Sequence, residues 1–149
     1  EYLIIMNMQK IVLIGLRLSM SFIFLWAFFD KLLGLGFATT AEKAWINGGS
    51  PTTGFLSFGV KGPFAEIFHS LAGVAVVDWL FMLGLLFIGV TLLLNKYVVW
   101  GSLAGVVMMS LMWLALLFPE NNPIIDEHIV YALVFALLAI KSRRGALLS

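Results

Sequence analysis

The stretch VAVVDWLFMLGLLFIGVTLLLNKYVVWGSLAGVVMMSLMWLALLF, residues 74–118, contains only two charged residues, Asp78 and Lys96. A helix needs about 20 mainly apolar residues to cross the hydrocarbon core of a bilayer, which is about 30 Å thick. The stretch is long enough for two such helices, and the polar pair Asn95-Lys96 divides it. It therefore predicts two consecutive membrane spans, from about 74 to 94 and from about 97 to 118.

Two further apolar stretches flank this pair, at about 10–33 and about 124–140. Of the 149 residues, 62% are hydrophobic and 11% are charged, and the mean hydropathy is +1.05. Because soluble domains contain about 25% charged residues, the composition excludes an ordinary soluble domain. We expect an all-α membrane protein in which residues 1–149 form one domain, a bundle of four transmembrane helices.

Positive charge is distributed unequally between the two ends of the predicted spans. Five basic residues flank the side that holds both termini and three lie on the other side: Lys10, Lys96, Lys141, Arg143 and Arg144 against Lys31, Lys43 and Lys61. Since cytoplasmic loops carry the excess of Lys and Arg, both termini are predicted to be cytoplasmic in a multi-pass protein of the cell (plasma) membrane. The net charge of +1 argues against a nucleic-acid partner, which requires a concentrated basic surface.

The connector between the first two spans, about 34–73, is much longer than a membrane hairpin needs. Thr39-Thr40-Ala41-Glu42 has capping-box spacing and predicts a short helix through Trp45, which Asn47-Gly48-Gly49 ends. Apolar residues recur at helical spacing from Phe64 to Leu71, which predicts an amphipathic segment on the outer membrane face. We expect this long, partly helical outer loop to hold the functional site.

Ionisable groups within a membrane span are costly and are candidates for function. Arg17 could bind a quinone carbonyl or pair with a carboxylate, or it could extend to the nearby interface. Asp30 and Lys31 are either an interfacial ion pair or part of a site, and Lys31 lies about 21 Å from Arg17 along a helix. Asp78 is either a helix cap beside the interfacial Trp79 or a buried carboxylate for proton transfer.

Both histidines are predicted on the loop side of the membrane. His69 follows Glu66 by one helical turn, and His128 precedes Tyr131 by the same spacing. The chain has no cysteine, so redox chemistry would need a quinone, a bound cofactor or a partner. Quinone reduction takes up protons, which a histidine or carboxylate can deliver, although these groups could equally cap the helix and bind loop backbone.

The histidines do not favour other redox centres. A haem would place two histidines on facing helices, and no three-ligand metal spacing is present, so we expect no haem or metal. The candidate catalytic or proton-transfer residues are His69, Asp78, His128 and Asp30; the candidate substrate- or quinone-binding residues are Arg17, Lys31, Trp45, Glu66, Trp79 and Tyr131.

Six segments follow one another in a characteristic order: Arg17-Leu18-Ser19, Trp26-Ala27-Phe28-Phe29-Asp30-Lys31, Ala44-Trp45-Ile46-Asn47-Gly48-Gly49-Ser50-Pro51-Thr52, Gly62-Pro63-Phe64-Ala65, Val77-Asp78-Trp79-Leu80-Phe81-Met82-Leu83-Gly84 and Asn122-Pro123-Ile124-Ile125-Asp126-Glu127-His128. Together they resemble the DoxX/DoxD family. The resemblance implies a four-helix membrane subunit of the DoxD type, the large subunit of thiosulfate:quinone oxidoreductase. It implies oxidation of thiosulfate to tetrathionate with electrons passed to quinone, and a DoxA-like small subunit as partner.

Two other functions remain open at this point. The chain could be a non-catalytic accessory subunit that packs with other membrane subunits in a respiratory or sulfur-oxidising complex. It could also be a small-molecule carrier, since charged groups near one face of a helical bundle can form a permeation path. The oxidoreductase interpretation predicts a pocket near the outer loop, lined by Trp45, His69 or Asp78.

Overall fold

The computed structural model describes residues 2–143, and all of their regular secondary structure is helical. Arg144, one of the basic residues used to predict orientation, lies outside the described residues. Four long helices make up most of the chain: α1 (Tyr2–Leu33), α3 (Ala75–Leu93), α4 (Val98–Ala115) and α5 (Glu127–Arg143). The long connector holds four short helical segments: η1 (Ala41–Lys43), η2 (Trp45–Asn47), η3 (Phe55–Gly59) and α2 (Ala65–His69).

Three helices are long and apolar enough to cross a membrane, namely Ile4–Leu33, Ala75–Leu93 and Val98–Ala115. The expected all-α membrane class is therefore confirmed at this level. The helix α5 is shorter, with 17 residues.

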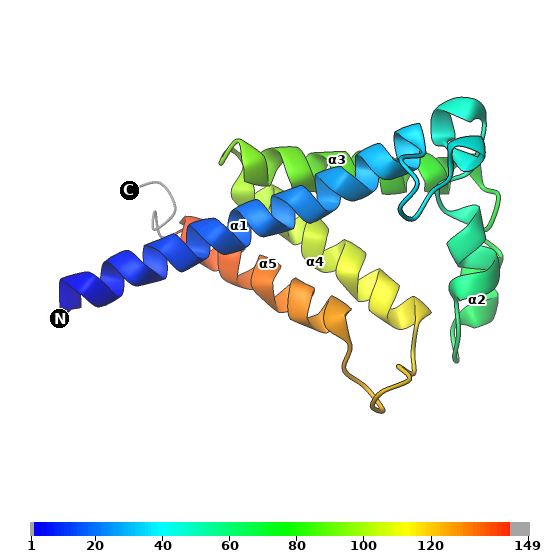
Figure 1. Cartoon of the computed structure of the whole chain (residues 1–149). Helices are drawn as coiled ribbons and strands as arrows, with labels where there is room; N and C mark the ends of the chain where they lie inside the picture. The colour runs from blue at the N-terminus through cyan, green and yellow to red at the C-terminus, as the bar shows by residue number, and fades with distance from the viewer. Residues whose placement is uncertain (1, 144–149) are drawn as a thin grey trace.

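The long helices form two pairs, α1 with α3 and α4 with α5, and α3 also packs on α4 (Figure 1). The pairs lie close together where α3 turns into α4, and they diverge toward the end of the molecule that holds the long connector (Figure 1). We call this the loop end. The turn between α3 and α4 is tight, because Asn95 and Tyr97 both adopt positive φ values, 54° and 56°.

Close packing in each pair depends on small residues. A Cβ at Gly89 of α3 would lie 2.5 Å from Leu25 of α1, and one at Gly105 of α4 would lie 2.6 Å from the Phe135 ring of α5. The Phe135 ring also meets Phe24 edge to face, with 5.2 Å between ring centroids. These contacts join the two pairs into one core.

Several helix bounds differ from the predicted segments. The first helix begins at Tyr2, ahead of the membrane span predicted from about residue 10, since no proline or glycine interrupts residues 2–10. The fourth helix begins at Glu127 rather than 124, because the Asp126 carboxylate accepts the backbone N–H of His128 (3.0 Å) and caps it there. In the connector, the predicted helix through Trp45 is two short 3₁₀ turns, and the amphipathic segment is helical only over Ala65–His69.

Candidate functional site

The connector is attached to α3 through the carboxylate of Asp78. Asp78 Oδ1 accepts hydrogen bonds from Ser50 Oγ (2.8 Å), Thr52 Oγ1 (2.5 Å) and the Thr52 backbone N–H (3.3 Å). Asp78 and Thr52 are 8% and 6% exposed, so these bonds are shielded from water. A buried carboxylate needs such donors, and here they come from the loop. Asp78 therefore holds residues 50–52 against α3.

The same connector is attached to α4 ten residues later. The backbone N–H of Lys61 donates to the carbonyl oxygen of Ala115 at the end of α4 (2.9 Å). Gly62 follows with a φ of +81°, and a Cβ there would lie 1.4 Å from the Leu117 carbonyl oxygen, so only glycine allows this approach. An exposed ion pair between Lys61 Nζ and Glu120 Oε1 adds a second link. The connector thus bridges the diverging ends of the two helix pairs.

His69 stabilises the connector near its attachments to α3 and α4. Its Nδ1 lies 2.6 Å from the carbonyl oxygen of Leu56, so α2 is tied to η3. Because a carbonyl oxygen only accepts, this contact requires a hydrogen on Nδ1. Leu56 is 6% exposed and belongs with Val60 and Ala115 to a small apolar cluster under the connector.

A cavity of about 620 Å³ lies beneath the bridge. Its walls are apolar side chains of α3 and α4, and its roof is formed by connector residues including Pro51, Thr52 and Phe55. This volume is in the range of pockets that bind small organic molecules. The prediction of a pocket near the long loop is therefore matched by the structure, but its expected lining is not: Trp45, His69 and Asp78 do not line it.

Lys31 is the one charged residue in the cavity lining. Its Nζ lies 5.8 Å from the centroid of the Phe81 ring, another lining residue. Its neighbour Asp30 faces elsewhere, because its carboxylate accepts the backbone N–H groups of Phe37 (3.2 Å) and Ala38 (2.9 Å). Between residues 2 and 143, no ion pair is formed by Lys31, so the predicted ion pair between Asp30 and Lys31 is absent there.

The other predicted residues of the connector region lie outside the cavity. The Trp45 and Trp79 rings meet edge to face, 4.6 Å between centroids, and Trp79 is 57% exposed. Glu66 is exposed on α2. Asp78 and His69 act on the cavity only indirectly, by holding its roof.

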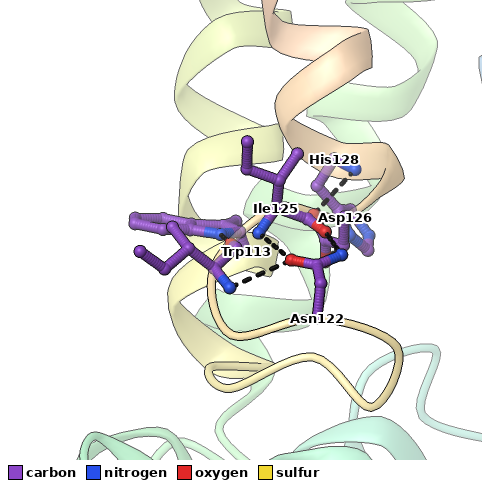
Figure 2. A network of polar contacts seen from close by, with 6 residues as sticks. Trp113, Asn122, Ile125, Asp126 and His128 are labelled. Carbon is purple, nitrogen blue, oxygen red and sulfur yellow. Dashed lines mark hydrogen bonds and ion pairs between the residues drawn. The ribbon is translucent and has the colours of Figure 1, made fainter.

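His128 lies at a different place, at the start of α5. Its Nδ1 is 2.9 Å from Asp126 Oδ2, and both side chains are largely buried. Figure 2 shows this pair beside Asn122, whose amide oxygen accepts the backbone N–H groups of Ile124 and Ile125 (3.0 and 2.6 Å). Tyr131, one turn further along, packs against the central core.

This turn contains one group that the sequence analysis missed. Donor atoms of Asp126, Glu127 and His128 lie within 4.8 Å of one another, which is close enough to hold a metal ion. The three residues are consecutive in sequence, and exposed acidic groups such as Glu127 are common without a metal. The hydrogen bonds of Asp126 already give the cluster a structural role as the cap of α5.

Arg17 is at the opposite end of the molecule from the cavity. Its Nη1 donates to the carbonyl oxygens of Leu92 and Leu93 (3.3 Å to the latter), which lie in the last turn of α3. The neighbouring Ser21 Oγ donates to the Gly89 carbonyl oxygen (2.7 Å). Arg17 therefore binds the end of α3 and meets no carboxylate among the described residues, and it is separate from Lys31 as predicted.

Comparisons with protein-family models, curated proteins and solved structures gave no match for this chain.

Proposed function

We propose that this chain is a membrane subunit that binds a quinone in the cavity under the connector, within an oxidoreductase of the thiosulfate:quinone type. One observation carries the quinone: an apolar cavity of about 620 Å³ with a single lysine in its wall. A quinone has the complementary form, since its ring and chain are apolar and its carbonyl oxygens accept hydrogen bonds. Lys31 Nζ supplies up to three donors for such an oxygen.

We further propose that α5 is a fourth span. Its 17 residues extend for about 25 Å, which is near the thickness of the hydrocarbon core. It packs along α4, which is itself long and apolar enough to cross. Four crossings put both termini on one side, and the basic residues Lys96, Lys141 and Arg143 favour the cytoplasm for that side of the cell membrane.

The proposed reaction is balanced by two half-reactions. Two thiosulfate ions lose one electron each and join through a new sulfur–sulfur bond to give tetrathionate. The quinone takes up these two electrons and two protons to become a quinol. Thiosulfate as donor, and a DoxA-like partner, rest on the resemblance to the DoxX/DoxD family alone, and quinone is the only cofactor that we propose.

A second candidate function is a non-catalytic accessory subunit. It is favoured by the contacts of Asp30, Asp78 and His128, which bind loop backbone, loop hydroxyls and a helix cap. These contacts explain the three residues without any proton transfer. In that case the cavity would hold a structural lipid, and the chemistry would belong to other subunits.

The test is thiosulfate-dependent reduction of a soluble quinone by the purified native assembly. A hydrogen bond from a charged group contributes about 1.5–3 kcal/mol, so Lys31→Met should raise the KM for quinone by about 10-fold to 100-fold. Lys43→Met is the matched control, because Lys43 is exposed in η1 and does not line the cavity. If the assembly is intact but does not reduce quinone, the oxidoreductase function is wrong and the non-catalytic accessory function is the better explanation. Equal effects of the two substitutions would remove Lys31 from the proposed site.

A further inference from the structure

We propose that the cavity receives a single-chain amphiphile sideways from the lipid, between α3 and α4, and that Gly84 and Met108 set how much of its hydrocarbon chain is seated. The identity of the head group as a quinone rests on the proposed function. The path and depth of the chain rest on the shape of the cavity.

The cavity opens on the surface that faces lipid. Three of its lining residues are also strongly exposed: Leu80 of α3 at 66%, and Val107 and Leu111 of α4 at 59% and 50%. A side chain that both lines a cavity and is exposed marks its mouth. All three are apolar and lie on helices long enough to cross a membrane, so the mouth meets hydrocarbon rather than water.

The two polar residues of the cavity lining, Lys31 and Thr52, lie toward its loop end, whereas the opposite end, at Gly84, Ala104 and Met108, is apolar. Thr52 belongs to the roof, where Asp78 holds it, and Lys31 lies beside Phe81. Along α4 the lining runs from Ala115 at the loop end to Ala104, a distance of about 17 Å. The long axis therefore orients an amphiphile, with its head near Lys31 and its chain directed toward Ala104.

Gly84 lies at the inner end of this path, and because it has no side chain it leaves space there for the ligand chain. A Cβ at Gly84 would lie 2.6 Å from Cε of Met108, and both residues line the cavity. A larger residue at 84 must displace the Met108 side chain or enter the space that the ligand chain would occupy. Met108 is partly buried and flexible, so its terminal methyl group can define the end of the path.

Two quinones with the same ring, one without a side chain and one with a decyl chain, test this proposal as binding probes for the purified protein in lipid nanodiscs. Gly84→Val should weaken binding of the decyl quinone by about 15-fold, since each of about two displaced methylenes contributes roughly a factor of four. Binding of the chainless quinone should change less than about twofold. Met108→Ala should strengthen binding of the decyl quinone, an effect that misfolding cannot imitate.

Gly15→Val is the matched control, because a Cβ at this glycine of α1 meets nothing within 4 Å. Equal loss of both quinones in Gly84→Val, or equal affinity of both for the unmodified protein, would overturn the proposed chain path while leaving quinone binding intact. If neither quinone binds but decanoate binds and is lost in Gly84→Val, the path stands and the quinone function fails. If no probe binds the unmodified protein, both fail.

Discussion

Replacement of Asp78 separates the structural anchor described above from the predicted role in proton transfer. The predicted helix cap was wrong, because α3 begins at Ala75 after Val74 and has no side-chain cap. All three hydrogen bonds from the connector converge on one oxygen, Oδ1. Asp78→Asn keeps an oxygen that can occupy this position but removes the negative charge. Asp78→Ala removes the acceptor altogether and leaves the Thr52 hydroxyl and N–H buried without it.

The expected magnitudes follow from these contacts. A buried donor left without its partner costs about 1–3 kcal/mol, and Thr52 contributes two, whereas Ser50 is less buried. Loss of the anchor in Asp78→Ala should therefore lower the free energy of local opening of the connector by about 3 kcal/mol. Asp78→Asn loses only the additional strength of charge-assisted bonds, about 1 kcal/mol.

Hydrogen exchange of the backbone amides of residues 50–60 measures this opening. About 3 kcal/mol corresponds to roughly 100-fold faster exchange in Asp78→Ala, and about 1 kcal/mol to roughly 5-fold in Asp78→Asn. Quinone reduction by the native assembly should be retained in Asp78→Asn. If Asp78→Asn abolishes reduction while its exchange stays slow, Asp78 carries protons and the anchor interpretation is insufficient. Unchanged exchange in Asp78→Ala would refute the anchor itself.

Two further predictions concern packing and pH. Gly105→Leu should lower the melting temperature of the detergent-solubilised protein, because the new side chain would overlap the Phe135 ring at a cost of about 1–3 kcal/mol. Gly15→Leu is the control and should leave the melting temperature unchanged, since a Cβ at Gly15 meets nothing within 4 Å. Equal decreases in melting temperature for the two variants would contradict the close packing of α4 on α5. The hydrogen bond from Lys61, and then its charge, hold the pKa of the Glu120 carboxyl below its ordinary value of 4.5. Because this pKa is lower in the folded state, the ion pair stabilises the folded state at pH values above the pKa of the unfolded chain. The contribution disappears as the pH falls through the pKa of the folded state. Acidification below about pH 4.5 should therefore release the Lys61 side chain from Glu120, seen as a pH-dependent ¹⁵N chemical shift of Lys61 Nζ, while the backbone bond to Ala115 keeps the connector in place. Glu120→Gln should remove this pH dependence, and a shift that persists in Glu120→Gln would contradict the assignment.

The sequence predicts the helical class because hydrophobic runs near 20 residues need no tertiary information. The sequence also predicts that Asp78 and the connector lie on the same side of the membrane, because consecutive spans cross it in opposite directions. The sequence cannot show that Asp78 contacts Thr52, because the two residues are 26 positions apart and neither segment contains a pattern that indicates its partner. For the same reason, the sequence cannot predict the role of Gly84, which depends on its contact with Met108 on the next helix. Nor can the sequence show that the Asp30 carboxylate accepts the backbone N–H groups of Phe37 and Ala38, because that contact depends on how the connector folds back on α1.

The position of the roof couples ligand binding to the stability of the connector. The connector crosses from α3 to α4 between two attachments, Asp78 with Thr52 and Lys61 with Ala115, and the cavity lies directly beneath it. A ligand that contacts Phe55 and the roof binds only when the connector is in place, so it must stabilise that state by mass action. At a quinone concentration 100 times its Kd, exchange of residues 50–60 should slow by about 100-fold. A ligand bound elsewhere on the protein would leave this exchange unchanged, which makes the roof a direct reporter of whether the cavity is occupied.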